Sequence, residues 1–224
     1  AIDNISIRAE SIVGRTNVQV TEPFWFRDEF NDDTVGRYFG HTHSHTISDG
    51  KLKASVNGHY IGVPVKLLDP TVDFIWKPTS MDSSSRYRVA VGFRTNAAIG
   101  SNLFNSGDPR YIVYIFGELN SVRLYKHNGV SMTADVDVKS ISVPFETDNI
   151  IRVSKVGRTF EVTVGATTVT LIDTTASDDI GASYPVIECV RIGSIPHEID
   201  NLQITGTRVY QKPIHRGAML ETYH

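Results

Sequence analysis

The sequence lacks the features that would cross-link a small secreted protein, span a membrane or bind nucleic acid. One cysteine, Cys189, occurs in 224 residues, which excludes a framework of internal disulfides. No run of about 18 apolar residues is present, so no membrane-spanning helix is expected. Lysine and arginine total 22 against 25 aspartate and glutamate residues, a formal net charge of −3. Because this balance gives no basic surface, we expect no nucleic-acid partner and no membrane insertion.

Signature motifs of enzymes are missing as well. The chain has no Gly-x-Ser-x-Gly nucleophile turn, no zinc-protease helix motif and no phosphate-binding loop. Apolar residues also do not recur at the i, i+3, i+4, i+7 spacing of an amphipathic helix. We therefore expect an all-β protein without catalytic activity.

Strand patterns fill the sequence instead. Residues 86–94 (RYRVAVGFR) alternate, with Tyr87, Val89, Val91 and Phe93 on one face and Arg86, Arg88 and Arg94 on the other, a period that predicts a strand. Residues 111–116 (YIVYIF) are apolar throughout and predict a central strand covered on both faces. Asp49-Gly50 and Asn128-Gly129 supply the positive φ angles that tight hairpin turns need. About a dozen such strands at regular spacing predict a sandwich or barrel.

Four parts of the chain resemble the concanavalin A-like jelly roll, the superfamily of laminin G domains, legume-type lectins and several glycan-binding modules. They are residues 26–30 (FRDEF) followed by 48–52 (SDGKL), the pair RYRVAVGFR and YIVYIF, the hairpin at 149–173, and residues 199–204 (IDNLQI). The resemblance implies an antiparallel β-sandwich whose last strand returns beside its first. We expect this sandwich over residues 23–206, with extended arms at residues 1–22 and 207–224.

A sandwich of this kind without catalytic motifs predicts a recognition module that binds glycans or a cell-surface receptor. The lack of disulfides favours a bacterial or bacteriophage setting, such as a tail fibre, baseplate or adhesin, and an extracellular or virion location. The arms predict a homo-oligomer or a larger virion or adhesin assembly. Two alternatives stay open: a purely structural or decoration protein, and a polysaccharide-degrading enzyme with an unrecognised site.

The longest candidate loop, residues 96–110, is the predicted ligand-binding segment, because long loops in compact domains are often binding loops. Phe104 offers a ring on which a sugar can stack, while Asn105, Asp108 and Arg110 offer hydrogen bonds. Three further aromatic groups have polar neighbours, with a core or turn role as the alternative: Tyr60 beside Asn57 and His59, Trp76 beside Lys77, and Tyr125 beside His127 and Asn128.

The sequence suggests two kinds of metal site. His41, His43 and His45 alternate along a predicted strand, so two imidazoles could chelate a transition metal from one face. A solvent-facing strand explains the same pattern without a third ligand, and we expect no transition metal there. Asp28 and Asp200 stand near the starts of the first and last core strands, which the resemblance makes neighbours. Their carboxylates predict a calcium site, with ordinary turn residues as the alternative.

Residues 197–203 (HEIDNLQ) superficially resemble the Glu-Ile-Asp-x-x-Glu strand of family 16 glycoside hydrolases, which share this fold. The resemblance puts the nucleophile at Glu198 and the acid at position 203. Gln203 occupies that position, and an amide cannot donate a proton as a carboxylic acid does. The segment is also expected as the last core strand rather than a central one, so retaining hydrolysis is not expected.

Overall fold

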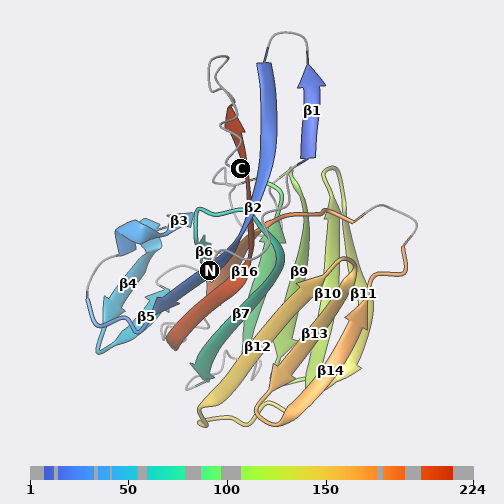
Figure 1. Cartoon of the computed structure of the whole chain (residues 1–224). Coiled ribbons are helices and arrows are strands. Elements are labelled where there is room, and N and C mark those ends of the chain that lie inside the picture. Colours follow the sequence, from blue (N-terminus) through green and yellow to red (C-terminus); the bar gives the residue numbers. More distant parts are fainter. Residues whose placement is uncertain are drawn as a thin grey trace.

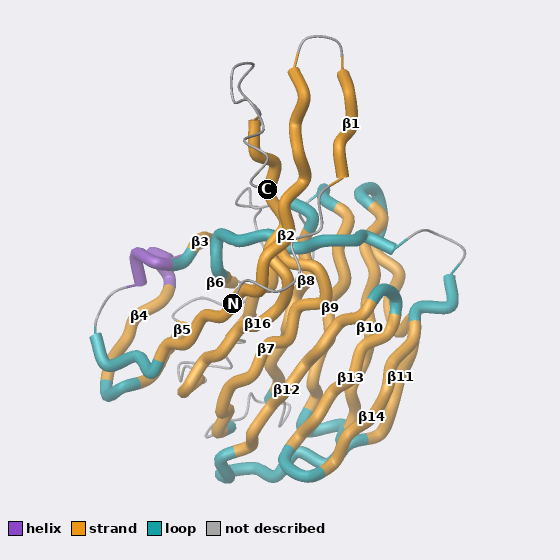
Figure 2. The backbone as a smooth tube through the Cα atoms, in the orientation of Figure 1, coloured by secondary structure: helices purple, strands orange, loops and turns teal. Residues whose placement is uncertain are grey.

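Two antiparallel β-sheets lie face to face around a hydrophobic core (Figure 1). In a computed structural model, the described residues are 8–12, 15–32, 35–40, 42–54, 60–78, 87–96, 107–175, 179–189 and 198–213. Their helical structure is confined to two short 3-10 helices, η1 (Val35–Arg37) and η2 (Thr42–Ser44), shown in purple in Figure 2. No helix among these residues is long and apolar enough to cross a membrane. The predicted all-β, antiparallel sandwich is confirmed.

The nine-stranded sheet holds both the first and the last strands. Its order is β1 (Arg8–Ile12), β2 (Arg15–Asp28), β16 (Glu198–Pro213), β7 (Leu67–Lys77), β12 (Asn149–Val156), β13 (Thr159–Val164) and β14 (Thr167–Ile172). Two short strands, β4 (His45–Ser48) and β5 (Lys51–Ala54), join it because β5 pairs with β16. The predicted pairing of first and last core strands is confirmed, since Phe26 lies opposite Ile204.

The seven-stranded sheet forms the other layer. Its order is β11 (Met132–Ser140), β10 (Ser121–Asn128), β9 (Pro109–Phe116), β8 (Arg88–Arg94), β15 (Tyr184–Cys189), β6 (Tyr60–Gly62) and β3 (Phe39–Gly40). Almost every residue of β8 and β9 is buried, which confirms the central strand at residues 111–116. Of the arginines on the other face of residues 86–94, Arg94 is only 1% exposed and Arg88 is half-buried, whereas Arg86 lies outside the described residues.

Alternating burial places the core between the sheets. Along β7, Val72, Phe74 and Trp76 are buried, whereas the residues between them are half-buried. The rings of Phe160 on β13 and Phe93 on β8 meet across the core with centroids 5.7 Å apart. Such contacts hold the outer face of each sheet in a fixed position relative to the other.

A β-ribbon extends the nine-stranded sheet beyond the sandwich, at the top of Figure 1. The pairing of β2 with β16 continues from Asp28 opposite Leu202 to Asn17 opposite Pro213, and β1 pairs with the first part of β2. The boundaries predicted after residues 22 and 206 therefore fall inside continuous strands. Residues 1–7 and 214–224 of the predicted arms lie outside the described residues.

Two predicted turns are confirmed by backbone angles. Asp49 and Gly50 have φ values of 56° and 69° and connect β4 to β5. Gly129 has a φ of 97° in the turn between β10 and β11. Both φ values of the Asp49-Gly50 pair lie in the left-handed region that a two-residue hairpin turn requires.

Candidate functional site

The ends of β8, β9 and β10 form a pocket beside the predicted ligand-binding loop. Its volume is about 290 Å³, and we call it the His127 pocket; its lining residues are Thr95, Pro109, Lys126, His127, Asn128, Asp179 and Ile180. Two segments that the sequence presents separately meet here, the end of the 96–110 loop and the His127-Asn128 turn. Of the predicted contact residues, Phe104 and Asn105 lie outside the described part of the chain.

The turn between β10 and β11 fixes two side chains of the His127 pocket. The N–H of Gly129 donates to Nδ1 of His127 at 3.0 Å. Burial, together with the charge of Arg110, lowers the pKa of His127, so its ring is neutral at neutral pH. Oδ1 of Asn128 accepts hydrogen bonds from the N–H groups of Val130 and Ser131 at 2.9 and 2.8 Å. These bonds orient the Asn128 amide and leave its amino group as the end that can donate to a ligand.

Asp108 and Arg110, two predicted ligand contacts, lie together with Arg94 at the base of the loop. Nη2 of Arg94 donates to Asp108 Oδ1 at 2.7 Å and its Nε donates to Oδ2 at 3.1 Å, a bidentate pair. Nη1 of Arg110 donates to the Asp108 carbonyl oxygen at 2.8 Å. Burial lowers the pKa of Arg110 to about 10, and its side chain is fully enclosed. In this arrangement Arg110 anchors the loop, and its predicted contact with a ligand stays a prediction.

A buried carboxylate, Asp173, binds Lys126, one of the residues that line the pocket. It accepts hydrogen bonds from Lys126 Nζ and from the Tyr111 hydroxyl, each at 2.6 Å, and from the N–H of Thr175 at 2.8 Å. Burial by itself raises the pKa of Asp173, but the bonds from Lys126, Thr175 and Tyr111 outweigh it and lower the pKa below its ordinary value. Lys126 is thus held by this carboxylate inside the protein.

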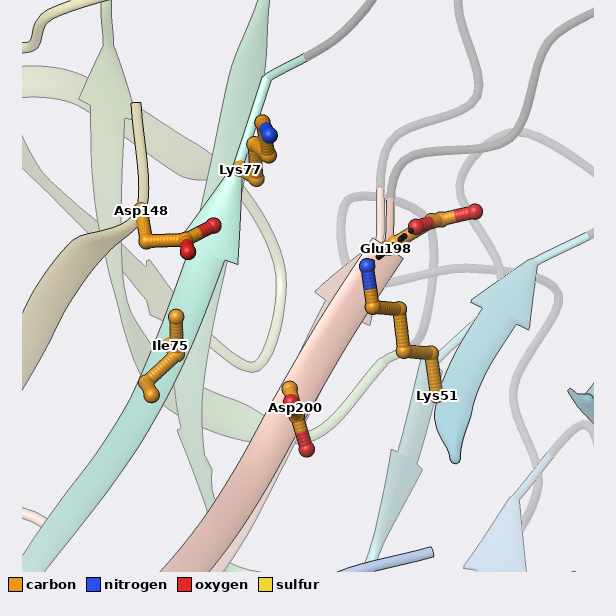
Figure 3. A pocket seen from close by; sticks show the side chains of 6 residues that line it. All are labelled: Lys51, Ile75, Lys77, Asp148, Glu198 and Asp200. Atoms are coloured by element: carbon orange, nitrogen blue, oxygen red, sulfur yellow. Dashed lines mark hydrogen bonds and ion pairs between the residues drawn. The ribbon is translucent and has the colours of Figure 1, made fainter. Parts of the chain in front are cut away.

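A second, smaller pocket of about 70 Å³ lies on the outer face of the nine-stranded sheet (Figure 3). Glu198 and Asp200 project from β16, Ile75 and Lys77 from β7, Lys51 from β5, and Asp148 from the turn before β12. Two residues of the segment that resembles the hydrolase strand (residues 197–203) therefore line this pocket. Contrary to expectation, β16 is an interior strand, paired with β2 on one side and β7 on the other.

Two lysines set the charge of Glu198 in this small pocket. Lys51 donates to Glu198 at 2.9 Å, and Lys53 forms an ion pair with it at 3.2 Å. Burial raises the pKa of Glu198, but these two lysines outweigh that effect and lower it, which keeps the carboxylate ionised. Glycoside hydrolysis needs a second carboxyl group with a raised pKa, and Gln203 stands where the resemblance would require it.

The histidine prediction is corrected by the local backbone. Residues 42–44 form η2 instead of a strand, so His43 and His45 do not alternate along one face. His43 is exposed, whereas His45 is buried at the start of β4. His41 lies outside the described residues. Within the described ranges, no three His, Cys, Asp or Glu side chains gather into a metal site.

The structure does not bring Asp28 and Asp200 together, because they face opposite sides of the nine-stranded sheet. Asp28 lies opposite buried Leu202 and accepts hydrogen bonds from the Phe30 N–H at 2.8 Å and the Tyr38 hydroxyl at 2.5 Å. Asp200 lines the small outer pocket (Figure 3). Cross-strand neighbours share a face, but the extra residue of a β-bulge after Asp200 interrupts that relation.

Comparison with known proteins supports the fold. No protein-family model and no curated protein matches the sequence. Among solved structures, a Bacillus subtilis protein of unknown function with a galectin-like fold gives a TM-score of 0.56 at 10% identity, over 82% of this chain and 96% of that one. The exoplasmic/lumenal domain of VIP36, in a Ca²⁺/Man3GlcNAc-bound form, gives 0.55 at 9% identity, over 75% and 82%. The chain has the fold of a concanavalin A-like β-sandwich.

An enzyme shares this sandwich too. A prokaryotic β-1,3-1,4-glucanase (lichenase) derived from a mouse hindgut metagenome gives a TM-score of 0.50 at 10% identity, over 85% of this chain and 99% of that one. Identities this low carry the fold alone, and a fold hosts many functions. The side chains of this chain must therefore distinguish binding from hydrolysis.

Four residues of the His127 pocket were missed by sequence reasoning: Thr95, Lys126, Asp179 and Ile180. Thr95 follows β8, whereas Asp179 and Ile180 precede β15, and no sequence motif links the two segments. The Thr95 hydroxyl donates to the Pro109 carbonyl at 3.0 Å, which joins two strand ends. Only the pairing of β8 with β9 and β15 brings these residues to one end of the sheet.

Proposed function

We propose that this domain is a non-catalytic glycan-binding module whose ligand enters the His127 pocket. The observation that carries the proposal is the composition of that pocket: Pro109 and Ile180 provide apolar surface, while Asn128, Thr95 and Asp179 provide polar groups. Small-ligand sites combine mostly apolar walls with a few placed hydrogen-bonding groups. A sugar presents the same combination, with C–H faces and hydroxyl edges.

The arrangement of carboxylates supports binding over catalysis. Among the residues that the structure describes, Asp179 is the single carboxylate that lines the His127 pocket, and its Oδ1 pairs with Lys155 Nζ at 3.1 Å. Hydrolysis of a glycosidic bond by the common mechanism needs two carboxyl groups on either side of it. Incubation with polysaccharides should therefore release no reducing sugar, and measurable release would contradict this part of the proposal.

We further propose an extracellular or virion-surface setting in a homo-oligomer or a larger assembly. The β-ribbon supports this part, because residues 210–213 of β16 pair on one side with β2 and, within the described residues, on the other side with no strand. Such an edge can accept a strand from another chain. Sedimentation analysis that finds a monomer at all concentrations would contradict the homo-oligomer.

The proposed site is tested on a glycan array with Asn128→Asp. The new carboxylate keeps the oxygen that accepts from Val130 and Ser131, so the turn persists, but the amino donor is lost. We expect binding about tenfold weaker than that of the wild type, the effect of one hydrogen bond. Asn120→Asp makes the same charge change in the exposed turn between β9 and β10 and should bind as the wild type does. Equal binding by both variants, or none by the wild type, would contradict the proposal.

A further inference from the structure

Trp25 is exposed to solvent although it lies in a well-paired strand. Its side chain is 63% exposed, whereas Trp76 is fully buried. The neighbouring Phe24 and Phe26 pack against the core, so the alternation of β2 turns the indole ring to the outer face of the nine-stranded sheet. A large exposed aromatic ring on a rigid strand is a typical contact residue for a ligand.

Two rows of mostly polar side chains start on β2, one at Trp25 and one at Arg27, and cross six strands in register. Strands β2, β16, β7, β12, β13 and β14 carry them and lie side by side in Figure 1. The first row consists of Trp25, Thr205, Thr71, Ser154, Glu161 and Thr170. The second consists of Arg27, Gln203, Asp73, Arg152, Thr163 and Thr168. All twelve side chains are half-buried or exposed, so both rows face outward.

The chemistry of these outer rows suits a neutral, hydroxyl-rich ligand. Hydroxyl and amide groups, which both donate and accept hydrogen bonds, dominate the rows. The charges balance, because the rows hold two arginines, Arg27 and Arg152, and two carboxylates, Asp73 and Glu161. Arg152 Nε also donates to Asp73 Oδ1 at 2.5 Å, which leaves no excess charge in the middle of the rows. At about 4.8 Å per strand, the rows extend for roughly 24 Å.

We propose that the outer rows bind an extended, neutral polysaccharide chain, with one pyranose ring stacked on Trp25 and the following sugars hydrogen-bonded across the strands. The ligand class rests on the proposed glycan-binding function, but the surface is separate from the His127 pocket and lies on the other sheet. The indole supplies a flat, rigid surface at low entropic cost, and the hydroxyl rows supply the hydrogen bonds.

A protein partner fits the outer rows less well. The centre of a protein–protein interface is depleted in charged groups and rich in apolar ones. Here Trp25 is the single apolar side chain among twelve, and four of the others are charged. The exposed apolar residues Ile150 and Val156 belong to the same sheet but to neither row.

Native gel electrophoresis through gels containing xyloglucan, galactomannan or laminarin tests the proposal. We expect at least one of these neutral polysaccharides to retard the wild type, and Trp25→Ala to weaken that binding about tenfold or more. Trp25→Phe, which keeps a smaller ring, should fall between the two. The fluorescence of Trp25 should change when the same polysaccharide is added, while the enclosed Trp76 should not respond. Retardation by none of the three, or equal retardation of Trp25→Ala, overturns the proposal.

Two control variants and a sedimentation experiment distinguish polysaccharide binding at the outer rows from binding elsewhere on the protein and from self-association. Val156→Ala shortens an equally exposed apolar side chain on the same sheet and should leave retardation unchanged. Asn120→Asp, in the exposed turn between β9 and β10, should also leave it unchanged. Array binding tests the His127 pocket through Asn128, and retardation tests the outer rows through Trp25, so the two proposals fail or hold independently. If sedimentation velocity instead shows self-association that Trp25→Ala abolishes without affecting retardation, a second copy of the chain covers this face and the polysaccharide proposal is overturned.

Discussion

Glu188 is a buried carboxyl group whose ionisation the fold resists. It is 2% exposed on β15 and accepts a hydrogen bond from the Tyr114 hydroxyl at 3.0 Å. Burial raises its pKa to about 7, although Tyr114 and the charge of Arg88 act in the opposite direction. In the unfolded chain the same group titrates near 4.5. The folded protein therefore holds a proton that the unfolded chain has already released between these two values.

Stability should consequently fall as pH rises from about 4.5 to about 7. A raised carboxyl pKa favours the folded state below this range, and the gain, about 3 kcal/mol at most, is lost across it. Glu188→Gln removes this titration and should flatten the dependence in urea titrations at several pH values. Glu161→Gln, at an exposed position, should keep the wild-type slope. The same slope in Glu188→Gln as in the wild type would contradict the assignment.

At the scale of elements, Gly62 is where three strands approach too closely for a side chain. It lies opposite Val186 on β15 and Phe39 on β3. A Cβ atom there would lie 2.3 Å from the Pro185 carbonyl oxygen and 2.7 Å from Val186 Cγ1. The backbone oxygen cannot move without disturbing β15, so this contact must strain the sheet.

Gly62→Ala should therefore destabilise the protein by about 3 kcal/mol, the effect of overpacking a rigid core. Gly157→Ala is the matched control, since nothing lies within 4 Å of its Cβ and only its φ of 56° opposes a side chain. We expect a loss of about 1 kcal/mol for it. Urea midpoints at constant m-value give both numbers, and equal losses would show that the close approach is absent.

At the scale of the whole molecule, the two sheets share one core. Tyr111 of the seven-stranded sheet packs on Phe160 of the nine-stranded sheet at 4.9 Å and donates to Asp173 beyond β14 at 2.6 Å. If either sheet unfolded, the buried groups of the other sheet would be exposed to water. Cooperative loss of both sheets follows from such shared burial.

Unfolding should accordingly be a single transition. The Trp25→Phe variant reports through enclosed Trp76 alone, so its fluorescence follows the core, while far-UV circular dichroism follows all strands. We expect the two curves to coincide in urea. A separate early transition in circular dichroism would instead assign the β-ribbon of β2 and β16 to an independent unit.

Much of the architecture follows from local pattern. The apolar run at residues 111–116 could only be covered on both faces, and Asp49-Gly50 could adopt two positive φ values that most residues avoid. Local sequence pattern predicted the candidate sites less accurately. Alternation puts Arg94 on the other face of β8 from Phe93, but it does not show that both faces are buried and that the guanidinium is enclosed against Asp108.

The sequence by itself determined an all-β chain of many short strands, because side-chain period and turn chemistry are local properties. The resemblance to the concanavalin A-like jelly roll implied the sandwich and the adjacency of its first and last core strands. Only the tertiary structure decided which faces reach solvent and which distant segments meet. Asp28 and Asp200 lie on opposite faces of the nine-stranded sheet, and Asn128 and Asp179 line one pocket. Strand pairing aligns Trp25 with Thr205 and Thr71. Strand register and bulges set those relations, and they depend on long-range pairing that no single stretch of sequence encodes.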